Sequence, residues 1–276
     1  MSILTRTSPF VQIKDGNQEP PIVIAHGLSG LVQFEELAKY IRTDHPIYGI
    51  QARGIDDAEE PLDRVEDMAQ LYLDALDEQD PGDGYILIGY SFGGLVALEM
   101  AQRLVDRGKD IKLLSLLDSY PHPRFLPARD RLRLFAKRMK GHAEQMSQLP
   151  YSESLAYFAK GFKRRLHLPG AGHESQRSPE RMALSFEEAA LRRVNQKCYL
   201  AYSKYLPKFY PGKIRFVTTE IKSFFPTNPV RVWGKLVSKL EVEIIPGDHL
   251  NIVTTEFRAL AAVLTRYIEE ATAGQV

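Results

Sequence analysis

The sequence of 276 residues contains a single cysteine, Cys198, so no disulfide can form within the chain. Its flanking residues, KCYLAY, lack the strand-to-turn context of a cysteine nucleophile, and we expect Cys198 to be a small buried side chain. No run of about 18 apolar residues is present, which excludes a transmembrane helix. The first residues, MSILTRTSPF, contain no apolar stretch of signal-peptide length, so we expect a cytoplasmic protein with no membrane partner.

An excess of either charge sign is also missing, because 36 Lys and Arg residues stand against 35 Asp and Glu residues. A chain balanced in this way has no overall field that would attract nucleic acid, and we expect no nucleic-acid partner. The glycine-rich patterns GxGxxG and GxxxxGK(S/T), which bind dinucleotides or phosphates, do not occur. We expect neither a bound cofactor nor a metal ion.

Short apolar runs bounded by turn residues recur along the chain and alternate with helical patterns. This alternation predicts an α/β protein with a mostly parallel sheet and helices on both faces. Residues Phe10 to Ile13 are expected to add an edge strand. The remaining expected strands are Ile22–Ala25, Ile47–Ile50, Tyr85–Ile88, Leu113–Leu117, Ile214–Val217 and Val242–Ile245, and the clearest helices are Val65–Glu78 and Leu95–Val105.

The alternation stops between about residues 121 and 211, where helical patterns occur without a convincing strand. We expect a helical lid inserted into one domain that spans residues 1–276, because ligand sites in such sheets lie at the carboxyl ends of the strands. A separate helical domain is the alternative, although no polar linker marks either end of the segment. Between Pro121 and Leu168 the segment is basic, with eleven Lys and Arg residues against three acids.

The stretch YILIGYSFGGLVALEMAQRL carries the pattern GxSxG at residues 89–93, with an expected strand before it and an expected helix after it. A serine in this context occupies a strained turn that exposes its hydroxyl above the sheet. Ser91 is therefore the candidate nucleophile. The N–H of Phe92 would lie at the positive end of the following helix, where it can stabilise an oxyanion.

A serine hydroxyl needs a base, usually a histidine oriented by a carboxylate. Of the seven histidines, only His249 follows a late strand, in the stretch LEVEIIPGDHLNIV, and we assign it as the base. Asp248 next to it is expected to brace the loop.

Two residues remain candidates for the acid. Asp118 ends the strand KLLSLLD, which directly follows the helix after Ser91. The usual hydrolase position lies one strand later, in IRFVTTEIKS, where Glu220 is the carboxylate at hand. The position of Asp118 after the helix that follows Ser91 favours it as the acid, and Glu220 remains the alternative acid.

The second oxyanion donor should come from the loop after an early strand. The stretch IVIAHGLSG ends a strand at Ala25 and turns through His26 and Gly27, so the N–H of Leu28 is expected to face the site. His26 is expected to brace this turn, with no role in proton transfer.

Together, the stretches HGLSG, IYGIQARGIDDAEEPLDRVEDMA, YILIGYSFGGLVALEMAQRL, LLDSYP, FYPGKI and IIPGDHLNIV resemble the thioesterase domains that end non-ribosomal peptide synthetases and polyketide synthases. The resemblance covers nearly the whole chain except the lid. It implies an α/β-hydrolase fold with Asp118 as the acid, because these terminal domains take the acid after the strand that follows the nucleophile helix. Separate editing thioesterases are similar too, but they take the acid later, near Glu220.

The resemblance implies release of an acyl, peptidyl or polyketide chain from the phosphopantetheine thiol of a carrier protein, to water or to a nucleophile within the chain. The basic lid is a candidate docking surface for an acidic carrier protein. No carrier domain occurs within the 276 residues. A carboxylesterase or lipase acting on free esters is the alternative enzyme, and a catalytically silent binding module is the alternative from another class.

Overall fold

The computed structural model describes residues 8–27, 31–55, 59–78, 84–126, 128–136, 179–221 and 228–273. Its internal contacts divide the chain into two units, which we describe separately. The first unit comprises Met1–Leu126 and Glu187–Val276, and the second comprises Pro127–Phe186. In the second unit, residues 128–136 and the start of α6 are helical.

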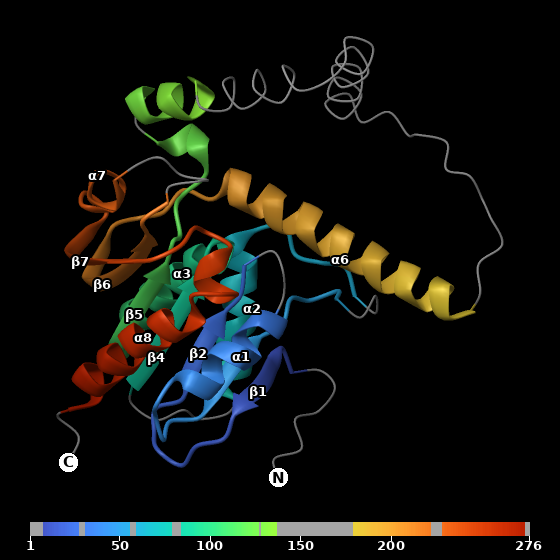
Figure 1. Cartoon of the computed structure of the whole chain (residues 1–276), viewed down its shortest axis with the longest axis horizontal. Helices are drawn as coiled ribbons and strands as arrows, with labels where there is room; N and C mark the ends of the chain where they lie inside the picture. The colour runs from blue at the N-terminus through green and yellow to red at the C-terminus, as the bar shows by residue number, and fades with distance from the viewer. Residues whose placement is uncertain are drawn as a thin grey trace. The chain divides into compact units, whose positions relative to one another are not determined.

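Among the described residues of the first unit, seven strands form one sheet in the order β1-β3-β2-β4-β5-β6-β7 (Figure 1). β1 is antiparallel to β3, and all the other neighbours are parallel, so β2 to β7 end at the same edge of the sheet. The strands are β1 (Phe10–Lys14), β2 (Ile22–Ala25), β3 (Ile47–Ile50), β4 (Gly84–Tyr90), β5 (Asp110–Leu117), β6 (Tyr210–Thr219) and β7 (Val237–Ile245).

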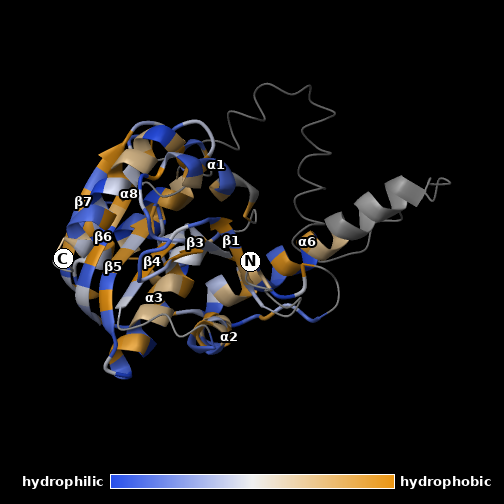
Figure 2. Ribbon diagram, turned by 90° about the horizontal axis from the view of Figure 1, so that it is seen from below, coloured by the Kyte–Doolittle hydropathy of each residue, from blue (hydrophilic) through white to orange (hydrophobic). Residues whose placement is uncertain are grey.

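Helices cover both faces of the sheet (Figure 2). α1 (Val32–Tyr40) and α8 (Phe257–Thr272) lie on one face, and α2 (Val65–Asp77) and α3 (Phe92–Asp106) lie on the other. Every residue of β4 is buried, as expected for a central strand with helices on both sides. Alternate residues of β2 and β4 pack into the core with α1 and α8; they are Ile22, Ile24, Ile86 and Ile88.

The predicted α/β architecture is confirmed, and each expected strand is present. The expected edge strand is β1, which lies at one edge of the sheet. α3 begins at Phe92, three residues before its expected start at Leu95. The remaining described elements are α6 (Pro179–Lys204), α7 (Pro229–Trp233) and two short 3₁₀ helices, Pro123–Phe125 and Asn251–Val253. Within the described ranges, no helix has both the length and the apolar character needed to cross a membrane.

The second unit falls within the segment 121–211 for which a helical lid is expected. Residues 137–178 of that segment lie outside the described residues. From Glu187 onward, α6 belongs to the first unit, where Tyr205, just after the helix, donates a hydrogen bond of 3.0 Å to Glu99 of α3.

Candidate active site

Ser91 lies in the tight turn between β4 and α3. Its backbone has a φ of 53°, a value that non-glycine residues rarely adopt. The flanking glycines are required by close packing: a Cβ at Gly89 would lie 2.4 Å from the Cα of Gly94, and a Cβ at Gly93 would lie 2.3 Å from the carbonyl oxygen of Ala25. The GxSxG spacing therefore places small residues where the strand and the helix touch.

Three side chains predicted from separate parts of the sequence lie together at the carboxyl edge of the sheet. The Oγ of Ser91 is 3.0 Å from the Nε2 of His249. The Nδ1 of the same imidazole is 2.8 Å from Oδ2 of Asp118. His249 and Asp118 are only 7% and 4% exposed, so their interaction is largely shielded from water. This arrangement can move a proton from the serine to the imidazole while the carboxylate holds the ring.

Backbone hydrogen bonds fix these turns to one another. Each turn or strand end donates its N–H to the end of the next strand in the sheet. The bonds run from Ser91 to Leu117 (2.9 Å), from Asp118 to Val217 (2.7 Å) and from Glu220 to Ile245 (3.0 Å).

The loop that carries His249 is held by its own residues. Oδ1 of Asp248 accepts hydrogen bonds from the N–H groups of Leu250 and Asn251, at 2.9 and 3.0 Å. Gly247 has a φ of 87°, which suits glycine at this turn. Asp248 thus braces the loop, as expected from the sequence.

Asp118 is supported from two directions. Its second carboxylate oxygen, Oδ1, accepts a hydrogen bond of 2.9 Å from the hydroxyl of Thr218 at the end of β6. The indole of the buried Trp233 donates to the carbonyl oxygen of Ser119, at 3.0 Å. Asp118 has a φ of 42°, which aspartate tolerates better than most residues. These contacts fix the direction in which the carboxylate points.

The structure describes one of the two expected oxyanion donors. Phe92 is the first residue of α3, so its N–H belongs to the positive helix end, where N–H groups have no acceptor within the helix. Leu28, the second expected donor, lies outside the described residues.

The described part of the turn after β2, which ends at Gly27, lies close to Ser91. A Cβ at Gly27 would lie 3.3 Å from the Cβ of Ser91. The Nδ1–H of His26 donates to the carbonyl oxygen of Gly27. Desolvation lowers the pKa of His26, so this imidazole stays neutral, which agrees with a bracing role in the turn.

Among the described residues, no group of three or more His, Cys, Asp or Glu side chains is arranged to hold a metal ion.

The family model described as Thioesterase domain matches residues 20–268. The chain belongs to the thioesterase domain family.

Curated relatives of this thioesterase include two peptide synthetases. It is 36% identical to the nonribosomal peptide synthetase pngA of Aspergillus terreus over 115 residues, which are 41% of this chain and 12% of the relative. It is 38% identical to the dimodular nonribosomal peptide synthase of Bacillus subtilis over 122 residues, which are 44% of this chain and 5% of the relative. The matches therefore span only a small part of each of these long proteins.

Solved structures similar to the thioesterase cover almost its whole length. The NocB thioesterase domain, in covalent complex with a fluorophosphonate nocardicin G analogue, has a TM-score of 0.61 at 20% identity, covering 91% of this chain and 95% of that one. The type II thioesterase YbtT from the yersiniabactin NRPS/PKS biosynthetic pathway has a TM-score of 0.64 at 15% identity, covering 96% and 99%. The likeness establishes the shared fold, and the expected α/β-hydrolase architecture is confirmed.

Glu220, the alternative acid of the thioesterase, is exposed. The Nδ1 of His249, to which an acid would bind, is instead in contact with Asp118. The geometry thus brings Asp118 to the imidazole. The position one strand later contributes Thr218, which donates its hydrogen bond to Asp118.

Two residues that contact the Ser91–His249–Asp118 group were not identified from the sequence. They are Tyr90, which contacts His249, and Thr218, which contacts Asp118. The hydroxyl of the buried Tyr90 donates a hydrogen bond of 2.6 Å to the carbonyl oxygen of His249. Its ring stacks on the imidazole, with centroids 5.1 Å apart and planes at 24°. In the sequence, Tyr90 is only the variable residue before the serine in GxSxG. That pattern does not indicate that its side chain contacts the catalytic histidine.

The phenylalanine variant of Tyr90 tests whether this contact positions His249. Burial raises the pKa of Tyr90, so its hydroxyl remains a donor throughout the usual assay range. Tyr90→Phe keeps the stacked ring and removes the donor, and we expect kcat for thioester hydrolysis to fall about five- to tenfold with KM unchanged. Tyr90→Leu, which removes the ring as well, should lower kcat further. Steady-state kinetics measure both effects, and an unchanged kcat in both variants would contradict a positioning role.

Proposed function

We propose that the thioesterase releases an acyl, peptidyl or polyketide chain from the phosphopantetheine thiol of a carrier protein through an acyl-enzyme on Ser91. The observation that carries the proposal is the continuous contact from the Ser91 hydroxyl through His249 to Asp118, at 3.0 and 2.8 Å. The family of the chain and its synthetase relatives support a thioester as the bond that is cleaved.

In the first half-reaction, Nε2 of His249 takes the proton of Ser91 while the serine oxygen attacks the thioester carbonyl carbon. The N–H of Phe92, with that of Leu28 as the proposed second donor, stabilises the oxyanion that forms, and each donor contributes on the order of 3 kcal/mol. The C–S bond then breaks, and the imidazolium returns its proton to the departing pantetheine thiolate. The acyl group remains as an ester on Ser91.

In the second half-reaction, His249 takes a proton from water, or from a hydroxyl or amine of the bound chain. The activated nucleophile attacks the ester carbonyl, and the imidazolium protonates the Ser91 oxygen as it leaves. Water gives a free acid, and an internal nucleophile gives a ring. In both cases Asp118 stabilises the imidazolium without taking its proton.

The carrier protein is the proposed partner, and residues 121–211 are the proposed lid through which it docks. Of the eleven basic residues counted between Pro121 and Leu168, the structure describes Arg124, Arg129, Arg131 and Arg133, and the other seven lie outside the described residues. An acidic carrier would be attracted to such a surface and oriented by it. The substrate arrives on the carrier's phosphopantetheine, so the proposed reaction requires no bound cofactor, and we place it in the cytoplasm.

Incubation with acyl-pantetheine thioesters, followed by mass spectrometry of the peptide that contains Ser91, tests the proposal. We expect a mass increase equal to the acyl group on Ser91, and faster turnover of the thioester than of the matching oxygen ester. Preferential cleavage of free oxygen esters would indicate a carboxylesterase. Absence of any adduct on Ser91, together with absence of labelling by a fluorophosphonate, would identify a catalytically silent binding module.

A further inference from the structure

The register of β5 against β6 places a threonine beside the acid. Leu117 pairs with Val217, so the next residues in line are Asp118 and Thr218. Thr218 is 1% exposed, and its hydroxyl donates a hydrogen bond of 2.9 Å to Oδ1 of Asp118. Among the described residues, this hydroxyl is the only hydrogen-bond partner of Oδ1, while Oδ2 contacts His249. The end of β6 therefore supplies a hydrogen-bond donor to the acid.

A buried tyrosine continues this chain of contacts. The hydroxyl of Tyr120 lies 3.4 Å from Oγ1 of Thr218. A threonine hydroxyl has one proton, and that of Thr218 is directed at Asp118. Tyr120 is therefore the donor in its contact with Thr218. Burial raises the pKa of Tyr120, so the phenol keeps its proton throughout the usual assay range.

Aromatic packing and a backbone hydrogen bond hold Tyr120 in place. Its ring packs edge-on against the buried ring of Phe216 in β6, with centroids 5.3 Å apart and planes at 67°. Ser119 lies between Asp118 and Tyr120 in the chain, and its carbonyl oxygen accepts the hydrogen bond from Trp233. Since the ring and the backbone are already fixed, little conformational entropy opposes the contact with Thr218.

The two hydroxyls lie where a buried carboxylate needs donors. Asp118 is almost fully buried, so water has little access to Oδ1. Without the donor, this oxygen would have no partner, which favours rotation of the carboxyl group and weakens the contact of Oδ2 with His249. A hydroxyl that itself accepts a hydrogen bond is a stronger donor, because the bonds of a chain polarise one another. Tyr120 thus strengthens the bond from Thr218 to the acid.

We propose that Thr218 and Tyr120 are positioning residues that act through Asp118. Tyr120 donates to Thr218, Thr218 donates to Oδ1 of Asp118, and Oδ2 thereby stays on the imidazole. Neither hydroxyl gives up its proton during the reaction. The two residues hold the carboxylate while His249 takes the proton of Ser91, so this inference rests on the nucleophile of the function proposed above.

The rate at which a fluorophosphonate labels Ser91 tests the proposal, because it reports activation of the serine whatever the natural substrate is. Thr218→Val keeps the branched shape and removes the donor, and we expect the labelling rate and kcat to fall about tenfold with KM unchanged. Thr218→Ser keeps the hydroxyl, and both rates should stay within about twofold of those of the unaltered protein. Tyr120→Phe removes the longer and weaker bond and should lower both rates about threefold.

Double variants show whether the two hydroxyls act as one chain. If Tyr120 acts through Thr218, Tyr120→Phe should have no further effect in the Thr218→Val background. Likewise, Thr218→Val should have no further effect on the labelling rate in the Asp118→Asn background. Effects that multiply in either pair would indicate independent structural contributions and contradict the proposal.

Thr219→Val is the matched control for Thr218→Val. Thr219 is the next residue of β6 and is fully buried, and its hydroxyl donates to the carbonyl oxygen of Ile221 at 3.2 Å. This variant also removes a hydroxyl donor from the end of β6, but the acceptor is a loop carbonyl. The labelling rate and kcat should therefore equal those of the unaltered protein.

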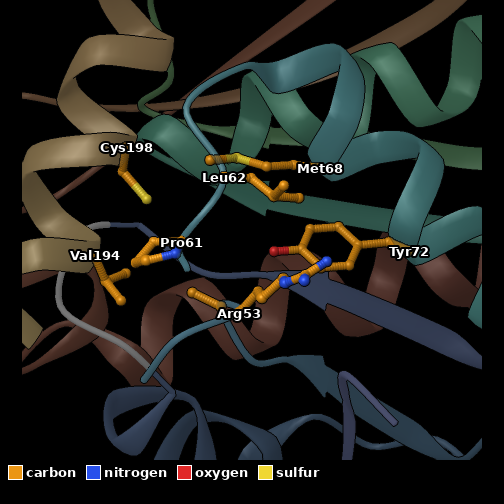
Figure 3. A pocket seen from close by; sticks show the side chains of 8 residues that line it. Arg53, Pro61, Leu62, Met68, Tyr72, Val194 and Cys198 are labelled. Atoms are coloured by element: carbon orange, nitrogen blue, oxygen red, sulfur yellow. The ribbon is translucent and has the colours of Figure 1, made fainter. Parts of the chain in front are cut away.

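Tyr72→Phe is the matched control for Tyr120→Phe. Tyr72 of α2 is also buried, and it lines a small hollow together with Met68 and Cys198 (Figure 3). Cys198 is 4% exposed, which agrees with the small buried side chain expected from the sequence. Tyr72 belongs to this packed interior and not to the chain that ends on Asp118, so the variant should leave the labelling rate unchanged.

Unchanged labelling of Thr218→Val would overturn the proposal, and so would an equal loss in Thr219→Val. If Thr218→Val does not fold, Tyr120→Phe provides the test, and a labelling rate equal to that of the unaltered protein refutes the role of the two hydroxyls.

The two proposals fail in different ways. Unchanged labelling of Thr218→Val, with Ser91-dependent thioester turnover intact, would remove the positioning role alone. A tenfold loss of labelling in Thr218→Val, in a protein that does not turn over acyl-pantetheine thioesters, would keep the positioning residues and remove the proposed release of carrier-bound chains.

Discussion

Replacement of Ser91 with alanine is expected to lower kcat for acyl-pantetheine hydrolysis by about 10⁴- to 10⁶-fold, because no other described side chain is placed to form the covalent intermediate. The substitution keeps the Cβ atom and the backbone, so the turn between β4 and α3 should be preserved. Binding of acyl-pantetheine amides should also be preserved. Single-turnover kinetics with an acyl-pantetheine thioester measure the loss directly.

Ser115→Ala is a matched control for this variant. Ser115 is a fully buried serine in the neighbouring strand β5, and its Oγ has no hydrogen-bond partner among the described residues. Its removal should leave kcat unchanged. Turnover by Ser91→Ala close to that of the unaltered protein would refute the acyl-enzyme mechanism, provided that thermal unfolding shows both variants to be folded.

Exchange of Asp118 for asparagine should produce the second-largest loss, about 10⁴-fold in kcat, because an amide cannot stabilise the imidazolium and favours the wrong tautomer of His249. Glu220→Gln is the matched variant at the alternative acid position. It is expected to leave kcat unchanged, because Glu220 is exposed while Asp118 contacts Nδ1 of the imidazole. Steady-state kinetics of the two single variants decide between the residues, and a larger loss in Glu220→Gln would assign the acid to β6.

The fold, Ser91 and His249 could be predicted because each rests on a local pattern. The strand before Ser91 and the helix after it appear directly in the hydrophobic periodicity, and the loop with His249 follows a late strand. The start of α3 was predicted too late, because Gly93 and Gly94 are poor helix formers in isolation. Tertiary contacts require glycine at both helical positions, because a Cβ at Gly93 would lie 2.3 Å from the carbonyl oxygen of Ala25 and a Cβ at Gly94 would lie 2.4 Å from Oγ of Ser119.

The acid and its supports depend on contacts across the sheet that a single sequence does not encode locally. Asp118 and Glu220 each follow a neighbouring strand, so spacing alone left both open. Thr218 contacts Asp118 across 100 positions of sequence, and Tyr90 contacts His249 across 159. Such pairs depend on strand register and side-chain direction, which periodicity does not determine.

The backbone hydrogen bonds that join the strand ends, from Ser91 to Leu117, from Asp118 to Val217 and from Glu220 to Ile245, have an evolutionary consequence. Every chain contributes these amide and carbonyl groups whatever its side chains, so the spacing of nucleophile, base and acid does not depend on which apolar residues fill the sheet. Drift in the strand interior is therefore tolerated as long as strand lengths are kept, whereas insertion of one residue into β4, β5 or β7 would displace a reacting group by a full step.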